Sequence, residues 1–548
     1  MTARATLLAA ILAYLASASS AAVAAPTAAP APAKPLQPLA ADAAAPAPAP
    51  APAKADKVKA APPAPVVANA TWSAAIKANA SAAPAIRALS PTELAAWKAK
   101  TAKDVKFITD DTKDFFLRHG PDPKNGGFHG TIARNGSSIE PTAKGLIVEG
   151  RYLWMYSVLA ERNATLKPEV ADLMNSTFRF LVDKFYDPAD SMFYQRVAAD
   201  GSRLTLDLGG RKRNSTALEE ANVIDAGAHK WLYGQPFAIL GLAAYARAFN
   251  STEALTVAMD TFRSIDAKFH DPEFGGWNQL DDSGLYIDFP GNAKPAGALG
   301  QVAKTNNLHY ALLPGLTELY KASRDPTVGD RLAELVGLYR DRLTLPEGYT
   351  AQFFTRDWQP LTNGTIVPTG PGSIEGTKAV PLVLVGHDLK TIQYVYEAGE
   401  ALQAGGHAAG QATLDASAAV SDAVATIALA HGYDWATGGF YNVIDAAGAV
   451  VDDDHVWWVQ NEAPPALYRL YGLTNDTRLL DMVDGTLAWI RNKGIDPVYG
   501  EQYWGVYPNG TVDERGTNKA EFWKAGYHVL HGMLGMEDLV APLGPASS

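Results

Sequence analysis

A short turn signature recurs six times along the chain, and it restricts the possible folds more than any other feature of the sequence. The first copy reads Asp-Pro-Lys-Asn-Gly-Gly-Phe at residues 122–128. Five further copies, some of them degenerate, follow at intervals of roughly 60 to 90 residues, at 187–194, 271–277, 346–353, 434–440 and 496–504. A supersecondary unit that repeats in a fixed order predicts a closed or stacked array.

The segments between the turns have the spacing of amphipathic helices. Residues 145–162, 237–249 and 308–323 carry apolar side chains at helical intervals. Each interval has room for two helices with their loops. Six helix pairs that close on themselves form an (α/α)6 barrel, so we predict an all-α fold with an inner and an outer ring of helices. The Gly-Gly-aromatic turns would then be short β-hairpins on one rim.

The segment before the repeats divides into a helix start and a stretch of biased composition. Residues 26–70 are mostly Ala and Pro and are predicted to be a disordered linker, since they cannot bury a core. Ser90, Pro91 and Glu93 match the pattern of a capped helix start. The barrel domain is therefore expected to span residues 90–540.

The N-terminus predicts a secretory route. Residues 1–25 are interpreted as a signal peptide, because Arg4 precedes a short apolar run at 7–16 and small residues follow. A plastid transit peptide is the alternative. We expect a protein of the secretory pathway, secreted and N-glycosylated, because Asn-X-Ser/Thr sequons are abundant. They lie at Asn69, Asn79, Asn135, Asn163, Asn175, Asn214, Asn250, Asn363, Asn475 and Asn509.

Charge and cysteine content restrict the partners. The formal net charge is -11 and the sequence pI is near 5.5, which argues against a nucleic acid or an anionic membrane as partner. The chain has no cysteine, and no Cys/His cluster has the spacing of a metal site. We therefore expect no metal and no cofactor.

Two distant histidines are the first candidates for chemistry. His387 follows Gly386 at the start of a predicted helix that runs to Leu402. A helix N-terminus favours the neutral imidazole, which can act as a base. Alternatively, His387 is only a polar residue at a helix start. His528 ends a second polar and aromatic stretch that begins at Phe522.

Four other stretches combine polar groups with aromatic ones. Arg151 lies among apolar helix positions and would face either a cavity or a structural carboxylate such as Glu149. His309 is most simply a satisfied core group, and Tyr233 most simply packs in the core. The pair Trp457–Trp458 could belong to the core or could stack on the apolar face of a sugar ring.

Five blocks in order resemble the N-acylglucosamine 2-epimerase family, which includes cellobiose 2-epimerases, mannose isomerases and the renin-binding protein. The resemblance covers roughly residues 92–539, and the family fold is the (α/α)6 barrel. The matching blocks are Arg151–Trp154, Tyr233–Phe237, Gly386–Lys390, Trp457–Ala463 and Trp523–His528.

This chain departs from the family pattern at three places. Lys390 stands where the family has a glutamate, one helical turn after the Gly-His pair. Gly526 replaces the proline before the last Tyr-His pair. The family's third histidine can be matched to His309 only with a shift of two positions.

The resemblance implies a sugar 2-epimerase, or an aldose–ketose isomerase, acting on a free reducing sugar such as N-acylglucosamine or N-acylmannosamine, mannose or cellobiose. In this reading His387 and His528 are the two bases on opposite faces of an enediolate, and Arg151 stabilises its charge. The family also implies a homodimer as one possible state. The implied substrate-binding residues are His309, Trp457, Trp458, Glu462, Trp523, Tyr233 and Lys390.

Two alternatives from other classes stay open at this stage. An (α/α)6 glycoside hydrolase would need paired carboxylates; the acidic runs 281–282 and 452–454 suggest this, although both are expected in solvated loops. A secreted carbohydrate-binding or interaction protein with a degenerate epimerase site is the other alternative, and Lys390 is the feature that suggests it.

Overall fold

The structure is a computed structural model that describes residues 83–204, 232–278, 302–361, 381–513 and 517–541, together with Ile76 and Lys230. The expected signal peptide at 1–25, the expected linker at 26–70 and the acidic pair at 281–282 lie outside these residues. The chain divides into two units, and the smaller one, residues 19–68, also lies outside them. The description that follows concerns the larger unit.

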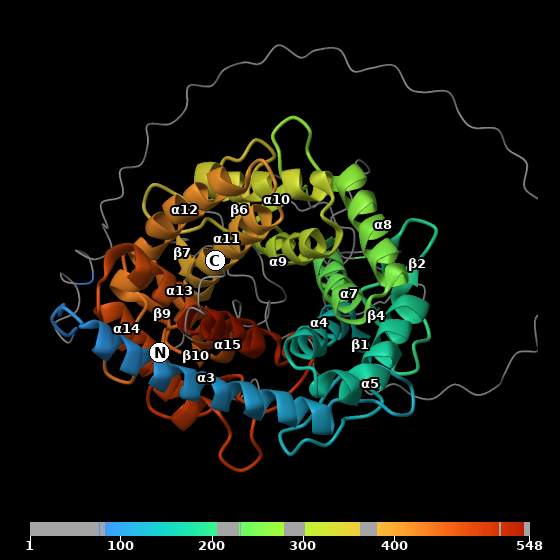
Figure 1. Cartoon of the computed structure of the whole chain (residues 1–548), viewed down its shortest axis with the longest axis horizontal. Helices are drawn as coiled ribbons and strands as arrows, with labels where there is room; N and C mark the ends of the chain where they lie inside the picture. Colours follow the sequence, from blue (N-terminus) through green and yellow to red (C-terminus); the bar gives the residue numbers. More distant parts are fainter. Residues whose placement is uncertain are drawn as a thin grey trace, which may run out of the picture. The chain divides into compact units, whose positions relative to one another are not determined.

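Six helices pack one on the next in a closed inner ring, which Figure 1 shows inside the other helices. Each of them packs on the next one along the chain, and the last, α15, closes the ring against α4. Most residues of each inner helix are buried. The inner helices are α4 (Leu146–Arg162), α7 (Gln235–Phe249), α9 (Asn306–Ser323), α11 (Val385–Ala404), α13 (Trp457–Thr474) and α15 (Tyr527–Val540).

Six more helices cover the inner ring, and each of them packs on one or two inner helices. These two rings confirm the predicted (α/α)6 barrel. The capping box at the start of α3 is also confirmed, since Ser90 Oγ accepts the Glu93 N–H and the Glu93 carboxylate accepts the Ser90 N–H. The outer helices are α3 (Pro91–His119), α5 (Leu166–Phe180), α8 (Thr252–Phe269), α10 (Pro326–Leu338), α12 (Gly410–His431) and α14 (Arg478–Trp489).

All six copies of the turn signature join an outer helix to the inner helix that follows. Each forms a tight antiparallel hairpin, including the weakest copy, where Thr344 pairs with Thr350. In the first copy Gly126 and Gly127 have φ of +89° and +67°, a region that side chains other than glycine rarely adopt. The prediction that these turns are short hairpins is therefore confirmed.

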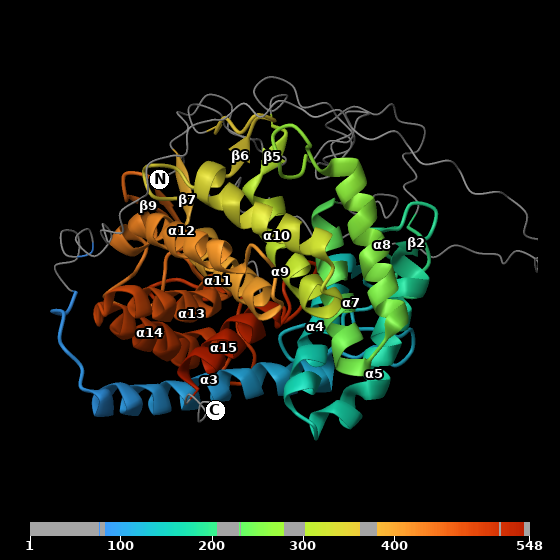
Figure 2. The same ribbon diagram turned by 45° about the horizontal axis from the view of Figure 1, so that its top comes forward.

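Short strands lie at the ends where the inner helices begin, and four of the five small sheets join neighbouring repeats. The antiparallel pairs are β1 with β4, β2 with β3, β5 with β6, β10 with β11, and the three-stranded set β7, β8 and β9. Figure 2 shows β5, β6, β7 and β9 at one end of the barrel. The strands are β1 (Lys144–Gly145), β2 (Tyr186–Asp187), β3 (Met192–Phe193), β4 (Arg196–Val197), β5 (Lys304–Thr305), β6 (Phe353–Phe354), β7 (Leu382–Leu384), β8 (Val443–Asp445), β9 (Val450–Asp452), β10 (His455–Val456) and β11 (Gly505–Val506).

Four short helical turns complete the set of elements. Three of them are π-turns that end an outer helix, and one 3₁₀ turn leads into α7. They are η1 (Leu181–Phe185), η3 (Leu232–Gly234), η5 (Tyr339–Leu343) and η6 (Ile490–Gly494).

One outer helix, α12, is long and apolar enough to cross a membrane by length and composition alone. Half of its most apolar window is buried inside the fold, where α12 packs on α11 and α10. Core helices pass the same test, so this helix is weak evidence for a membrane span.

Close helix packing at the inner ring leads to a stability prediction. A Cβ on Gly532 of α15 would overlap the backbone carbonyl of Asn461 in α13, whereas a Cβ on the exposed Gly472 would meet nothing within 4 Å. Gly532→Ala is therefore expected to lower the free energy of unfolding by about 1 to 3 kcal/mol. Gly472→Ala, the matched control, should raise it by roughly 0.5 to 1 kcal/mol through helix propensity. Urea unfolding of both variants checks this, and equal effects would contradict the close approach.

Candidate active site

The starts of the inner helices bring both candidate histidines to the same aromatic side chain. His387 lies in the first turn of α11, Trp458 in the first turn of α13 and His528 in the first turn of α15. The ring centroid of Trp458 is 5.6 Å from that of His387 and 5.8 Å from that of His528. Two residues that are far apart in the sequence thus flank one half-buried indole.

Arg151 of α4 completes this side of the site. Its Nη2 lies 3.2 Å from His528 Nε2, and its Nη1 donates to the carbonyl of Trp523 at 2.8 Å. The guanidinium also lies over the rings of Phe237 and Tyr527, at 4.5 and 5.1 Å from their centroids. Glu149, the suggested structural partner, instead accepts the Phe128 N–H of a turn. Within the described ranges no carboxylate pairs with Arg151, so the structural ion pair is not formed there.

The hydrogen bonds of His528 define which nitrogen is basic. Nδ1 lies 2.7 Å from Glu462 Oε1. Burial alone would raise the pKa of Glu462, but the charge of His531 and hydrogen bonds from both histidines hold this pKa well below its usual range. The carboxylate therefore accepts from Nδ1–H, and Nε2 keeps its lone pair, which accepts from Arg151. Burial, with Lys390 and Arg151 nearby, holds the pKa of His528 well below its usual range.

His387 is also a neutral imidazole. Gln352 Nε2 donates to the carbonyl of Thr350, which leaves Gln352 Oε1 to accept from His387 Nδ1 at 2.9 Å. Nε2 of His387 is then the basic atom. Desolvation, followed by the charge of Lys390, holds the pKa of His387 well below its usual range. The neutral state agrees with the sequence-based expectation, but its main causes are burial and Lys390.

Lys390 lies one helical turn after His387 and acts on both histidines. It is 2% exposed, and its Nζ lies over the rings of Tyr310, Trp458 and Tyr394, at 4.1, 5.2 and 5.4 Å from the centroids. In the described part of the chain it has no ion-paired carboxylate. Burial lowers the pKa of Lys390 to about 7, against the attraction of Glu462. An amine of this kind changes charge near neutral pH.

The other aromatic candidates have different surroundings. Trp523 is half-buried, and its ring centroid is 6.2 Å from that of Tyr233, whose hydroxyl lies 3.0 Å from the Tyr310 hydroxyl. Trp457 is 3% exposed and packs on Trp504 at 4.5 Å. Trp523 and Trp458 can therefore offer surface to a ligand, whereas Trp457 and Tyr233, at 3% and 5% exposed, belong mainly to the core.

His309 has a structural environment. It is fully buried, its Nε2 accepts the Trp277 N–H at 3.1 Å, and its Nδ1 donates to the Thr305 carbonyl at 2.7 Å. Burial lowers its pKa to about 4. Glu149 and Gln460 occupy the same first turn of other inner helices and accept the N–H of a turn aromatic in the same way. The structure does not bring the His309 ring into the cluster around Trp458.

Several residues of the site have no counterpart in the sequence-based set. Tyr310 touches His387, with ring centroids 4.6 Å apart, and Gln352 holds its Nδ1. His531 lies one turn after His528 and hydrogen-bonds the other oxygen of Glu462 at 2.9 Å. The His-X-X-His spacing at the start of a helix was the one available signal for His531.

The acidic run at 452–454 differs from expectation. Asp452 and Asp454 are 1% and 0% exposed, so the prediction of a solvated loop is wrong for both. Asp452 accepts a hydrogen bond from Asn442 Nδ2 at 2.8 Å. Among the described residues, one trio of potential metal ligands lies together, Asp122, His129 and Glu140, and Asp122 is already paired with Lys144 at 2.8 Å.

Comparison with known proteins agrees with this architecture. The family described as N-acylglucosamine 2-epimerase (GlcNAc 2-epimerase) matches residues 211–532. Cellobiose 2-epimerase of Bacteroides fragilis is 27% identical over 433 residues, which cover 77% of this chain and 95% of that protein. Cellobiose 2-epimerase of Ruminococcus albus is 25% identical over 422 residues, 76% of this chain and 92% of its own length.

Solved structures of such enzymes have a similar fold. Cellobiose 2-epimerase from Spirochaeta thermophila superposes with a TM-score of 0.62 at 25% identity, over 81% of this chain and 97% of that one. A D-mannose isomerase has a TM-score of 0.60 at 17% identity, over 79% and 97% of the two chains, which shows the shared fold. The barrel and the relatives together define an enzyme of the carbohydrate epimerase and isomerase class. The chain belongs to the N-acylglucosamine 2-epimerase family.

Proposed function

We propose that the protein epimerises a free reducing sugar at C2 through two histidine bases. The observation that carries this proposal is the pair of neutral imidazoles, His387 and His528, which flank Trp458 with Nε2 as the basic atom of each. An imidazole that is unprotonated at neutral pH is suited to removing a proton next to a carbonyl.

The reaction follows from the acidity of the C2 hydrogen in the open-chain aldose. One histidine takes this proton, the carbonyl oxygen gains negative charge, and an enediolate forms. The other histidine then delivers a proton to the opposite face of C2, which gives the epimer. If the O2 hydroxyl proton moves to O1 and a proton is delivered to C1 instead, the product is the ketose, so the same residues support isomerisation.

The charge of the enediolate needs nearby cations. Arg151 contacts His528 directly, and the ammonium of Lys390 lies in the same cluster, over the Trp458 ring. Preorganised positive charge in a water-poor site stabilises an oxyanion strongly. We assign Arg151 as the main oxyanion partner and Lys390 as a second, pH-dependent one.

The substrate class is suggested by the relatives. The curated relatives are cellobiose 2-epimerases, so we propose a β-linked disaccharide with a reducing glucose as the first candidate and mannose as the second. The half-buried Trp458 and Trp523 offer flat apolar surfaces on which a sugar ring can stack.

Hydrogen exchange tests the proposal. The purified protein is incubated in D2O with cellobiose, glucose, mannose and N-acetylglucosamine, and C2–H is followed by NMR. We expect deuterium at C2 together with the epimer for at least one sugar. Folded protein that binds a sugar without any exchange would overturn the epimerase and favour the carbohydrate-binding alternative, for which Lys390 in place of the family glutamate is the supporting observation.

We also propose that the protein passes through the secretory pathway and carries N-glycans. The six sequon asparagines within the described ranges are all exposed: Asn135, Asn163, Asn175, Asn250, Asn475 and Asn509. Protein expressed through a eukaryotic secretory route should lose mass on treatment with a peptide N-glycosidase. An unchanged mass would contradict this.

A further inference from the structure

Hydrogen bonds continue beyond His528 toward the other end of the barrel. Glu462 binds His528 with one oxygen, at 2.7 Å, and His531 Nδ1 with the other, at 2.9 Å. His531 Nε2 in turn lies 3.1 Å from Glu397 Oε2. The chain His528–Glu462–His531–Glu397 alternates between bases and acids and links helices α15, α13 and α11.

His531 carries the positive charge of this chain. Although burial opposes it, the charges of Glu397 and Glu462 raise the pKa of His531 to about 10. The imidazolium therefore donates from both nitrogens, one proton to each carboxylate. Glu462 shares its negative charge between a cation and the neutral His528.

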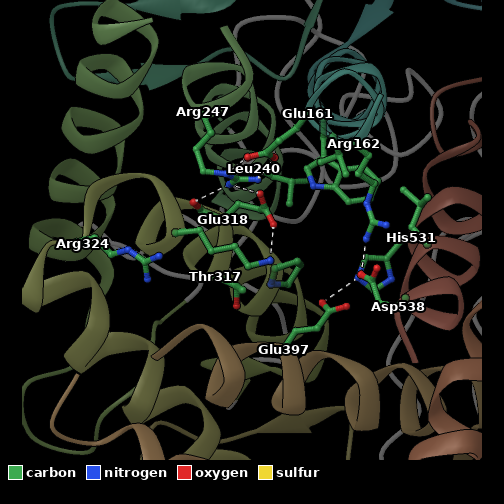
Figure 3. Close-up of a pocket in the computed structure, with 16 residues that line it drawn as sticks. Glu161, Arg162, Leu240, Arg247, Thr317, Glu318, Arg324, Glu397, His531 and Asp538 are labelled. Atoms are coloured by element: carbon green, nitrogen blue, oxygen red, sulfur yellow. Dashed lines mark hydrogen bonds and ion pairs between the residues drawn. The ribbon is translucent and has the colours of Figure 1, made fainter. Parts of the chain in front are cut away.

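The Glu397 end of this hydrogen-bonded series reaches a pocket. Glu397 and His531 line a cavity of about 520 Å³ together with Arg247, Glu318, Lys321 and Asp538, near the ends of the inner helices (Figure 3). The Glu397 side chain is 21% exposed, whereas that of Glu462 is fully buried. This pocket lies away from the helix starts that hold His387 and Trp458.

We propose that His531 and Glu397 are positioning residues that keep His528 in its base form. The inference rests on the proposed function, because His528 is a base only in that mechanism. The cation at His531 neutralises part of the Glu462 charge. Without it, the full carboxylate charge would act on His528 and favour a proton on Nε2.

Other charged groups act on His528 and on Glu397, and a substitution at His531 leaves them in place. Lys390 from α11 and Arg151 from α4 act on His528. Lys321 from α9 and Arg469 from α13 act on Glu397. Tyr394 and Tyr527, which also contact His531, have pKa values raised well above 10 by burial and stay neutral.

The test compares variants that remove or keep the charge. His531→Gln removes it and should move the acidic limb of the kcat/KM–pH profile to higher pH by about one unit, which is a tenfold loss on that limb, with recovery at alkaline pH. His531→Arg keeps a cation with two donors and should stay near the unchanged profile. A loss of activity that is equal at every pH, in both variants, would mean a structural role only and would overturn the proposal.

A measurement without turnover separates this proposal from the proposed function. Protein labelled with ¹⁵N-histidine reports the protonation of the His528 ring directly, and His528→Gln assigns its signals among the 11 histidines. We expect His528 to titrate at higher pH in His531→Gln. If this shift occurs but no sugar reacts, the positioning role of His531 is supported and the proposed epimerase function is wrong. If sugars react and the His528 titration is the same in both proteins, the positioning role of His531 is wrong.

Glu397→Gln gives a second variant in case His531→Gln does not fold. This substitution keeps the shape and removes one of the two anions that hold the proton on His531. The ¹⁵N signals of His531 should then show deprotonation at a lower pH than in the unchanged protein. An unaltered titration of His531 would overturn the proposed role of Glu397.

Discussion

Asparagine in place of His528 is expected to lower kcat/KM for C2 epimerisation by a factor on the order of 10³. The variant loses the base on one face of C2 and also the group that Glu462 and Arg151 hold in place. His387→Asn should have a loss of similar size, because epimerisation needs a proton transfer on each face. Initial rates with the sugar identified by NMR measure both effects.

The two variants should differ in a way that identifies the face each base serves. A variant that keeps one of these two bases can still remove and return the C2 proton on a single face. Each variant is therefore expected to exchange deuterium into one epimer only, and the two variants into opposite epimers. Exchange into both epimers by either variant would contradict the two-base assignment.

A histidine outside the cluster supplies the control. His129 directly follows the first turn copy and contacts Glu140, at 2.7 Å, with a side chain 16% exposed. His129→Gln should leave the rate and the exchange pattern unchanged. A large effect at His129 would indicate that histidine loss acts through folding.

The fold could be predicted because the information lies in local turn chemistry. Five of the six copies carry at least one Gly, and all six carry an aromatic residue, so even the degenerate copy at 346–353 pairs as the others do. The number of turns predicted the number of helix pairs, and the helical spacing of apolar residues between the turns predicted the helices themselves.

The site was less accessible to sequence reasoning, since side-chain direction depends on neighbouring repeats. His309 and Tyr310 are adjacent, yet the His309 ring faces its own turn and the Tyr310 ring faces His387. Helical spacing alone does not decide between these directions. The contact of His531 with Glu397 joins residues 134 positions apart, and no local pattern carries such a pairing.

Lys390→Met is expected to raise stability and lower activity at once. The folded-state pKa of Lys390 is about 7, below the ordinary value of 10.5. Between these values the unfolded chain binds the extra proton, so burying this amine costs stability that grows as pH falls from 10.5 to 7 and is constant below. Methionine removes that cost, and the gain in unfolding free energy at pH 6 should be about 1 to 3 kcal/mol after the lost cation–π contacts are subtracted.

The same substitution removes a cation from the reaction site. Loss of one oxyanion partner is expected to lower kcat by about 10²-fold, and the pKa values of His387 and His528 should rise, because Lys390 lowers both. Urea unfolding at pH 6 and at pH 10 measures the change in unfolding free energy, and kcat measured over the same pH range gives the change in activity. Lys390→Glu restores the residue type of the family pattern and separates charge from shape. If Lys390→Met is less stable at pH 6 and fully active, Lys390 is a packed structural residue, and its place between the two histidines has no catalytic consequence.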